Sequence, residues 1–321
     1  MILEKQVINM YKGLAFTRCD DNGTAYYFSN DDFEGLNKES YPFTSSMGHT
    51  LQGYIYSYPD PIEGRIIVFD HGFFGGHLSY MREIEMLCRH GYTVFAYDHT
   101  GCMESGGESP NGMTQSLRDL NDCLVTIKKD NRFAGLDISV MGHSWGGFST
   151  MNIPSLHPEI SRIVVMSGFV SATLLIEAFF GGILKPYRKA ITELEKKANP
   201  DYFGFDGIKT LSETKAKALL IYSSDDKLCR KQVHFDRLKS ALSNKENIKF
   251  ILEENKGHNP NYTKDAVKYL QEFSEKRTTL SKKNLLTTNE QKKEFVNSFD
   301  WKRMTEQDEK VWNEIFKALD E

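Results

Sequence analysis

Residues 137–151 read Asp-Ile-Ser-Val-Met-Gly-His-Ser-Trp-Gly-Gly-Phe-Ser-Thr-Met. The first five form a short β-like run, and the last five are small and compatible with a helix. Between them, Gly142 and Gly146 frame Ser144 with the G-x-S-x-G spacing. Strand, G-x-S-x-G and helix in this order are typical of a nucleophile elbow, where the glycines let strand and helix approach around a strained serine. The sequence therefore predicts Ser144 as a nucleophile, against the alternative of an ordinary turn serine.

Two later segments supply the partners that a serine nucleophile needs. A hydroxyl requires a base to accept its proton and an acid to orient that base, and here the acid precedes the base in the chain. The strand-like run 217–222 leads to Asp226, and the run 248–252 leads to His258. Open α/β sheets place their active sites at the carboxyl ends of the strands, so we expect both side chains to lie near Ser144.

A glycine-rich loop follows the first long strand-like run, residues 65–70. It reads His71-Gly-Phe-Phe-Gly-Gly76 and lacks the endings of a phosphate-binding or dinucleotide-binding loop. We therefore expect it to contribute to an oxyanion hole, in which backbone amides stabilise a tetrahedral intermediate. The predicted donors are the amides of Phe73 and Trp145.

These stretches resemble α/β-hydrolase-fold serine hydrolases, in the branch of monoacylglycerol lipases, cinnamoyl and feruloyl esterases and prolyl-aminopeptidase-like enzymes. The resemblance covers about residues 45–275 and includes residues 91–101 besides the motifs above. It implies an acid one residue before a short apolar pair, which favours Asp226 over Asp225. Asp225 would then be a solvated carboxylate or the cap of a helix starting near Arg230. The segment after Asp98 departs from the usual family pattern, and so does the charged tail.

Alternating strand and helix patterns predict an α/β fold: a mostly parallel central sheet with helices on both faces. We predict a hydrolase domain over residues 1–277 with a helical lid inserted at about 168–213, where the fold carries its lid. The apolar start of this insertion can wall a pocket for a hydrophobic group or simply hold the lid on the body. We assign substrate contacts to Phe74, His143 and Phe169, although His143 can equally pack its own loop.

The C-terminal residues 278–321 are predicted to form a helical extension. An apolar stripe at helical spacing runs along its last part, at Val311, Trp312, Ile315, Phe316 and Leu319. Such a stripe packs on its own domain or, less commonly, forms a surface for a second copy or another partner. A homo-oligomer formed through these helices is therefore one of the two alternatives.

Composition limits the class of protein. The 321 residues have a net charge of −4 with interspersed signs, which argues against a nucleic-acid partner. Five scattered cysteines, an N-terminal segment without a signal-like apolar run and the absence of a long apolar stretch predict reduced thiols, no membrane span and a cytoplasmic location. No metal-binding spacing appears, so we expect neither a metal nor a cofactor.

The sequence thus predicts a cofactor-free serine esterase of the carboxylesterase and lipase type. Its expected substrate is a small-molecule carboxylic ester with a small or medium, apolar or aromatic acyl group, cleaved through an acyl-enzyme. Two alternatives use the same three residues: a thioesterase, or an amidase or aminopeptidase that binds the substrate amine through Glu177, Glu193 or Glu195 in the lid. A third is a non-catalytic binding module, which fold alone does not exclude.

Overall fold

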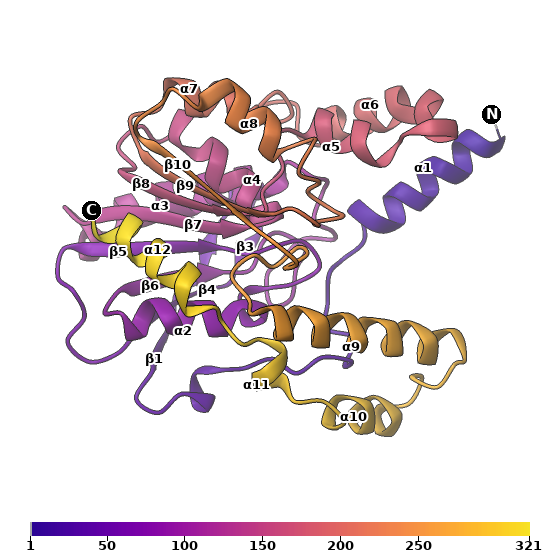
Figure 1. Ribbon diagram of the computed structural model, residues 1–321, viewed down its shortest axis with the longest axis horizontal. Helices are drawn as coiled ribbons and strands as arrows, with labels where there is room; N and C mark the ends of the chain where they lie inside the picture. The colour runs from indigo at the N-terminus through magenta and orange to yellow at the C-terminus, as the bar shows by residue number, and fades with distance from the viewer. Residues whose placement is uncertain (1) are drawn as a thin grey trace.

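A central sheet of eight strands organises the chain, and the computed structural model describes residues 2–321 (Figure 1). The strand order is β1-β4-β6-β5-β7-β8-β9-β10, and a separate ribbon pairs β2 with β3. Strands β5 to β10 are mutually parallel, whereas β4 is antiparallel to both β1 and β6. The strands are β1 Asn37–Ser40, β2 Phe43–Thr44, β3 Thr50–Leu51, β4 Gly53–Ser57, β5 Arg65–Asp70, β6 Thr93–Tyr97, β7 Asp137–His143, β8 Arg162–Met166, β9 Lys217–Ser223 and β10 Ile248–Glu253.

Helices connect and cover these strands. The α-helices are α1 Ile2–Ala15, α2 Met81–Arg89, α3 Gln115–Lys129, α4 Trp145–Asn152, α5 Ala172–Phe179, α6 Arg188–Ala198, α7 Gly207–Glu213, α8 Phe235–Leu242, α9 Lys264–Lys282, α10 Asn289–Asn297, α11 Trp301–Met304 and α12 Glu309–Asp320. Short 3-10 helices are η1 Asn30–Asp32, η2 His77–Tyr80, η3 Asn131–Phe133, η4 Ile153–Ser155 and η5 Gly182–Tyr187.

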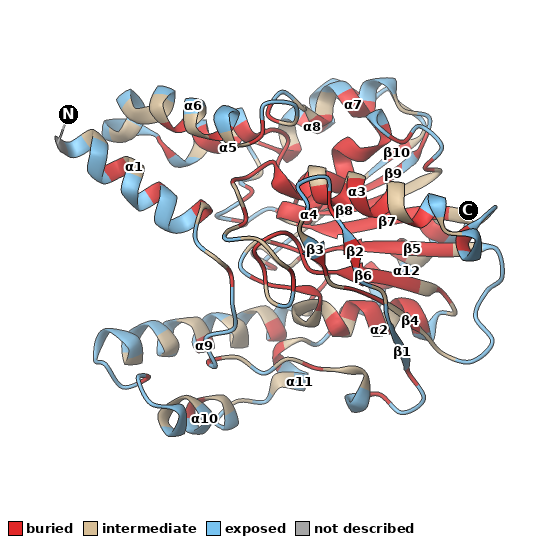
Figure 2. Ribbon diagram, turned by 180° about the vertical axis from the view of Figure 1, so that it is seen from behind, coloured by how far each residue is buried: buried red, intermediate tan, exposed pale blue. Residues whose placement is uncertain are grey.

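The buried strands have apolar residues on both faces, because each face is covered by helices. On β5, Ile66 and Val68 pack into the core beneath α3, α4 and α8, while Ile67 and Phe69 pack into the core beneath α2 and α12. The sheet is correspondingly buried along its centre (Figure 2). The predicted mostly parallel sheet with helices on both faces is confirmed.

The N-terminal helix α1 was not predicted, although Val7, Met10 and Leu14 lie at helical spacing. It contacts α6 and η5, and in both ribbon views it lies beside α6 (Figures 1 and 2). We call α1, α5, η5 and α6 together the cap. Helix α7, at the end of the predicted insertion, instead contacts α4 and α8 on the body. The limits of the predicted lid stay a prediction.

The C-terminal segment contributes to two layers. Helix α12 contacts β8 and β9, and its Val311, Trp312, Ile315 and Leu319 are buried there, so the apolar stripe packs on its own domain. Helices α9 to α11 form a small separate core of Phe273, Leu286, Phe295 and Met304. The predicted domain limit at residue 277 falls inside α9.

All five cysteines are buried free thiols. Within residues 2–321, no helix combines the length and the apolar character needed to cross a bilayer. The N-terminal segment was predicted to lack the apolar run of a signal peptide. Its first residue, Met1, lies outside the described residues.

Candidate active site

Ser144 lies at the turn between β7 and α4, at the carboxyl edge of the sheet. Its backbone is strained, with φ 58° and ψ −109°, and its amide donates to the carbonyl of Met166 at 2.8 Å. A Cβ on Gly142 would lie 2.4 Å from the carbonyl oxygen of Gly146, and a Cβ on Gly146 would lie 2.0 Å from that of Asp70. Glycine is therefore required at both positions for the strand and the helix to meet at this turn.

The structure brings Ser144, His258 and Asp226 together. The Oγ of Ser144 lies 2.8 Å from Nε2 of His258, and Nδ1 of His258 lies 2.7 Å from Oδ2 of Asp226. Because Nδ1 faces a carboxylate, it carries the proton, which leaves Nε2 free to accept the proton of the serine hydroxyl. This is the arrangement that activates a serine as a nucleophile.

Asp226 is ionised in this setting. Burial opposes its charge, but the hydrogen bond from His258 and the amides of Leu228 and Cys229, at 2.8 and 3.0 Å, hold its pKa below the ordinary value. A buried negative charge next to the imidazole stabilises the imidazolium that forms when His258 accepts a proton.

Asp225 is exposed, as expected of a solvated carboxylate, but it does not cap a helix. No helix begins near Arg230, since the next one, α8, starts at Phe235. Instead, Oδ1 of Asp225 accepts hydrogen bonds from the amides of Lys256 and Gly257, at 3.1 and 3.0 Å. Asp225 therefore fixes the loop that carries His258. The expectation of a solvated carboxylate is confirmed, since the residue is exposed, whereas the alternative of a helix cap was wrong.

The two predicted oxyanion donors lie on either side of the serine in the chain. Trp145 is the first residue of α4, so its amide has no acceptor within the helix. The amide of Phe73 has no hydrogen-bond partner within residues 2–321. The Phe73 ring packs edge-on against the indole of Trp145, with centroids 4.8 Å apart. Both amides are thus available, and their role toward an oxyanion stays a prediction.

A chain of hydrogen bonds links the glycine-rich loop to the histidine loop. The amide of Gly72 donates to the hydroxyl of Tyr80 at 3.0 Å, and this hydroxyl lies 2.8 Å from Nδ1 of His143. Nε2 of His143 lies 2.7 Å from the carbonyl of His258 and must therefore carry the proton. Burial lowers the pKa of His143 to about 3, which keeps the ring neutral. Tyr80, which nothing in the sequence singled out, thus connects the two loops around Ser144.

A cavity of about 850 Å³ opens at Ser144 and His258. The cap provides one wall with side chains of α1 and α5, and the loops around the serine provide the other. No charged side chain lines it among the described residues. Its wall residues include Met10, Tyr11, Leu14, Phe73, Phe74, Met113, Phe169, Leu175, Ile176, Phe179, Phe180, Leu184 and Leu228. We call this space the acyl cavity, after the group that the function proposed below would place in it.

The three residues assigned to substrate contacts all border the acyl cavity. Phe74 is 59% exposed at its mouth, whereas Phe169 is 3% exposed and stacks on Phe148. His143 borders the cavity as well, but both its ring nitrogens are engaged within the protein. Contact of these residues with a substrate stays a prediction.

Donor atoms of Asp226, His258 and Cys229 lie within 4.8 Å of one another. Nδ1 of His258 and Oδ2 of Asp226 are already paired, so a cation held by all three would have to displace that hydrogen bond. Burial raises the pKa of the Cys229 thiol, which further disfavours the thiolate that a metal requires. The geometry fits a histidine that is oriented by Asp226 and accepts the proton of Ser144 better than it fits a metal centre.

Comparisons with known proteins bear on the fold that carries this site. Residues 62–206 match the family described as "Serine aminopeptidase, S33". The esterase Pf2001 of Pyrococcus furiosus has a similar structure, with a TM-score of 0.59 and 18% identity over 84% of this chain and 97% of the esterase. The chain has the α/β-hydrolase fold. The family match and the similar structures agree on this fold.

Other similar structures differ in their reactions. The acetyl xylan esterase from Paenibacillus sp. R4 has a TM-score of 0.53 and 18% identity over 73% of this chain and 82% of its own. The acylaminoacyl peptidase of Pyrococcus horikoshii has a TM-score of 0.52 and 17% identity over 71% of this chain and 38% of its own. A curated relative, the uncharacterized protein YqkD of Bacillus subtilis (strain 168), is 26% identical over 43% of this chain and spans 43% of its own length in the match.

Proposed function

We propose that this protein is a serine esterase that hydrolyses carboxylic esters with a small or medium, apolar or aromatic acyl group. The observation that carries the proposal is the hydrogen-bonded series Asp226, His258 and Ser144 at the mouth of an uncharged, mostly apolar cavity. The hydrocarbon part of an acyl group carries no polar atoms, so an apolar cavity beside the nucleophile suits it.

The reaction follows from the positions of these atoms. Oγ of Ser144 attacks the ester carbonyl while Nε2 of His258 takes its proton, and the amides of Phe73 and Trp145 stabilise the oxyanion. The tetrahedral intermediate then collapses, the alcohol leaves with the proton from His258, and an acyl-enzyme remains. Water, deprotonated by the same imidazole, attacks the acyl-enzyme and releases the carboxylic acid.

A fluorophosphonate probe tests the nucleophile directly. The wild type is expected to be labelled at one site, and Ser144→Ala is expected to abolish both labelling and ester hydrolysis. Absence of labelling in folded wild-type protein would instead favour a non-catalytic binding module on the same fold.

A series of aryl esters with increasing acyl length tests the substrate class. We expect kcat/KM to rise from acetyl to medium chains, because each buried methylene contributes about 0.8 kcal/mol, or roughly fourfold. A flat response would count against an apolar acyl pocket. Thioesters of the same acids would be hydrolysed too if only the acyl group were recognised.

The second candidate, an aminopeptidase or amidase, is favoured by the name of the matching family, serine aminopeptidase. An aminopeptidase needs an anionic group near the scissile bond, and none of the three proposed lid residues lines the acyl cavity. Glu177 and Glu193 are exposed, and Glu195 is fully buried against Tyr11. We therefore expect an aryl ester to be cleaved much faster than the corresponding aminoacyl amide, and the reverse order would favour the peptidase.

A further inference from the structure

The C-terminal segment that precedes α12 contacts the loop that carries His258. Tyr262 and Gln307 form an isolated antiparallel bridge between the two segments. Next to this bridge, the amide of Asp308 donates to the carbonyl of Asn261 at 2.8 Å. The proposed reaction takes none of its catalytic groups from the C-terminal segment, so the contact with the histidine loop points to an indirect role.

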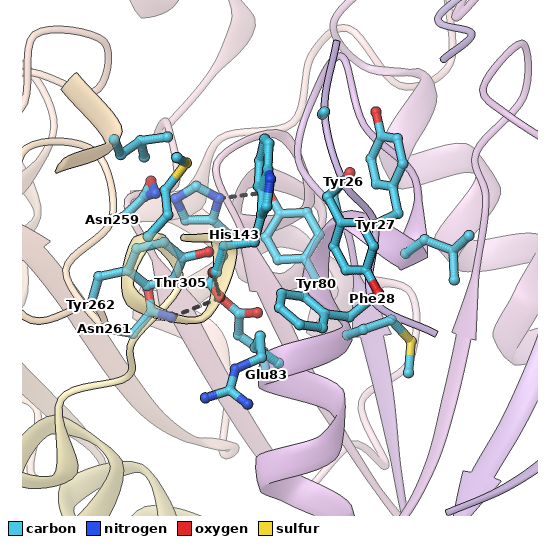
Figure 3. A pocket seen from close by; sticks show the side chains of 18 of the residues that line it. Tyr26, Tyr27, Phe28, Tyr80, Glu83, His143, Asn259, Asn261, Tyr262 and Thr305 are labelled. Atoms are coloured by element: carbon cyan, nitrogen blue, oxygen red, sulfur yellow. Dashed lines mark hydrogen bonds between the residues drawn. The ribbon is translucent and has the colours of Figure 1, made fainter. Parts of the chain in front are cut away.

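The side chain of Asn261 connects this contact to a third element. Its Nδ2 atom lies 2.8 Å from Oε1 of Gln307 and 2.9 Å from Oε1 of Glu83 on α2. Figure 3 shows the bond to Glu83 in the wall of a small cavity that Thr305 of the C-terminal segment also lines. The chain that follows His258 is therefore held both by α2 and by the C-terminal segment.

Lys256, two residues before His258, is buried although it carries an ammonium group. Its side chain is 1% exposed. The Nζ atom lies 2.6 Å from Oδ2 of Asp308, 3.0 Å from Oε2 of Glu253 and 3.3 Å from the carbonyl oxygen of Pro260. Three oxygen atoms thus surround a group that has three N–H bonds. Because burial of a charge is costly unless the charge is paired, these contacts hold the side chain in place.

The two oxygens of Asp308 have separate partners. Oδ1 accepts a hydrogen bond from the amide of Lys310 at 2.9 Å and thereby caps α12, while Oδ2 binds Lys256. Burial opposes the charge of Asp308, but the hydrogen bond from Lys256 holds its pKa below the ordinary value. Asp308 therefore joins the start of α12 to the buried ammonium group.

The contacts of Lys256 close the loop around His258. Lys256 and Pro260 lie two residues before and two residues after the histidine, and the Nζ atom of the first contacts the carbonyl of the second. The amide of Asn259 also donates to the carbonyl of Lys256 at 3.1 Å. The imidazole in this loop lies 2.8 Å from Oγ of Ser144. Since a displacement of about 1 Å can cost about 100-fold in rate, closure of this loop bears directly on proton transfer.

We propose that Asp308 of the C-terminal segment is a positioning residue for hydrolysis. It holds the ammonium group of Lys256 against the carbonyl of Pro260 and thereby keeps the imidazole of His258 within reach of the nucleophile. The proposal rests on the hydrolase function proposed above. Loss of Asp308 leaves Glu253 to balance the buried ammonium group. A buried charge that has lost a partner moves toward water, so the contact that closes the loop is lost as well.

Asp308→Asn tests the proposal, because asparagine caps a helix as well as aspartate does but offers no second oxygen to Lys256. With an aryl ester, kcat should fall by about 10- to 100-fold while KM stays within about twofold. Glu314→Gln on α12 is the matched control and should leave kcat unchanged. It breaks an exposed ion pair with Lys249 near the start of β10, whereas the histidine loop follows the end of that strand. A kcat of folded Asp308→Asn equal to that of the wild type would overturn the proposal.

A double-mutant cycle separates an effect through Lys256 from a general loss of stability. Lys256→Met removes the ammonium group but keeps an unbranched side chain, and it should lower kcat as well. If Asp308 acts through Lys256, adding Asp308→Asn to Lys256→Met should lower kcat by less than about twofold further. Independent, multiplicative effects of the two substitutions would contradict the proposed route.

The downfield ¹H NMR signal of the Nδ1 proton of His258 reports the position of the ring without any need for catalysis. This proton lies between His258 and Asp226, and its signal is assigned by its disappearance in His258→Ala. The signal should shift or broaden in Asp308→Asn and stay unchanged in Glu314→Gln. A signal that Asp308→Asn leaves unaltered would refute a positioning role. Failure of the hydrolase function would appear separately, as absence of ester hydrolysis in wild-type protein whose signal still responds to Asp308→Asn.

Discussion

Different interactions hold the two sides of the acyl cavity. We call the side that carries Ser144, Asp226 and His258 the floor, and the opposite side is the cap. On the floor, Ser144, Asp226 and His258 follow strands of the central sheet, and hydrogen bonds hold each of them. The cap contributes mostly apolar side chains, several of which are half-exposed, such as Met10 at 60% and Phe179 at 50% (Figure 2). One buried polar contact, from Tyr11 on α1 to Glu195 on α6 at 2.6 Å, joins its two outer helices.

This contrast corresponds to two different requirements of the proposed reaction. Proton transfer needs donor and acceptor atoms within hydrogen-bond distance, so the groups proposed for it are fixed by the sheet and by backbone amides. Accommodation of an acyl group needs only apolar surface of suitable volume, which loosely packed helices can provide. Variants of the floor should therefore alter turnover, whereas variants of the cap should alter stability and chain-length preference.

The largest effect is expected on the floor, from Asp226→Asn. The amide cannot hold the imidazole in the required tautomer or stabilise its charge, so kcat should fall by about 10⁴-fold. Asp225→Asn, the adjacent matched control, should cost about tenfold to 100-fold, because it only loosens the loop of His258. Steady-state kinetics with one aryl ester checks both, and a larger loss from Asp225→Asn would reverse the assignment.

The next effect is expected in the cap. Burial raises the pKa of Glu195 from 4.5 to about 7, so the folded protein holds this proton more tightly than the unfolded chain. The contribution of Glu195 to the free energy of unfolding is fully present below about pH 4.5. It is lost as the pH rises through about 7, and the loss is up to about 3 kcal/mol.

Denaturant unfolding of wild type and Glu195→Gln at about pH 5 and about pH 8 measures this difference. The wild type should lose stability relative to the variant over that interval. Parallel pH dependence of the two proteins would mean that Glu195 is not buried against Tyr11 in solution.

A smaller effect on the floor is expected from Tyr80→Phe. The substitution removes the hydroxyl that joins Gly72 to His143, so the glycine-rich loop and the histidine loop lose a common hydrogen-bond partner. We expect kcat to fall by about tenfold with KM within about twofold. Tyr58→Phe, whose hydroxyl bonds to Glu85 away from the serine, is the control. A change confined to KM would contradict a positioning role.

The smallest effect is expected from Leu14→Ala on α1. Loss of part of this apolar wall should lower kcat/KM for medium-chain esters by about threefold and leave acetyl esters unchanged. Leu3→Ala on the same helix serves as the control, because Leu3 does not line the acyl cavity. Equal effects on all chain lengths would mean that α1 does not contact the acyl group.

The arrangement of the floor was largely predictable from local sequence. Gly142 and Gly146 around Ser144, and acidic and histidine residues directly after two strand-like runs, imply convergence because parallel strands end at one edge of the sheet. The cap was less predictable. Helix α1 carries many apolar residues, but its position follows from contacts with α6, which lies about 180 residues later in the chain.

The sequence by itself determined the fold, the strained serine turn and the identity of Ser144, Asp226 and His258. Each of these was recognised from a pattern of residues that are neighbours in the chain. The tertiary structure alone decided that Asp225 binds the loop of His258, that Tyr80 and His143 connect two loops, and that α1 completes the acyl cavity. These contacts join segments from distant parts of the chain. Tertiary packing determines which of these residues meet, and no local pattern in the sequence indicates such a pairing.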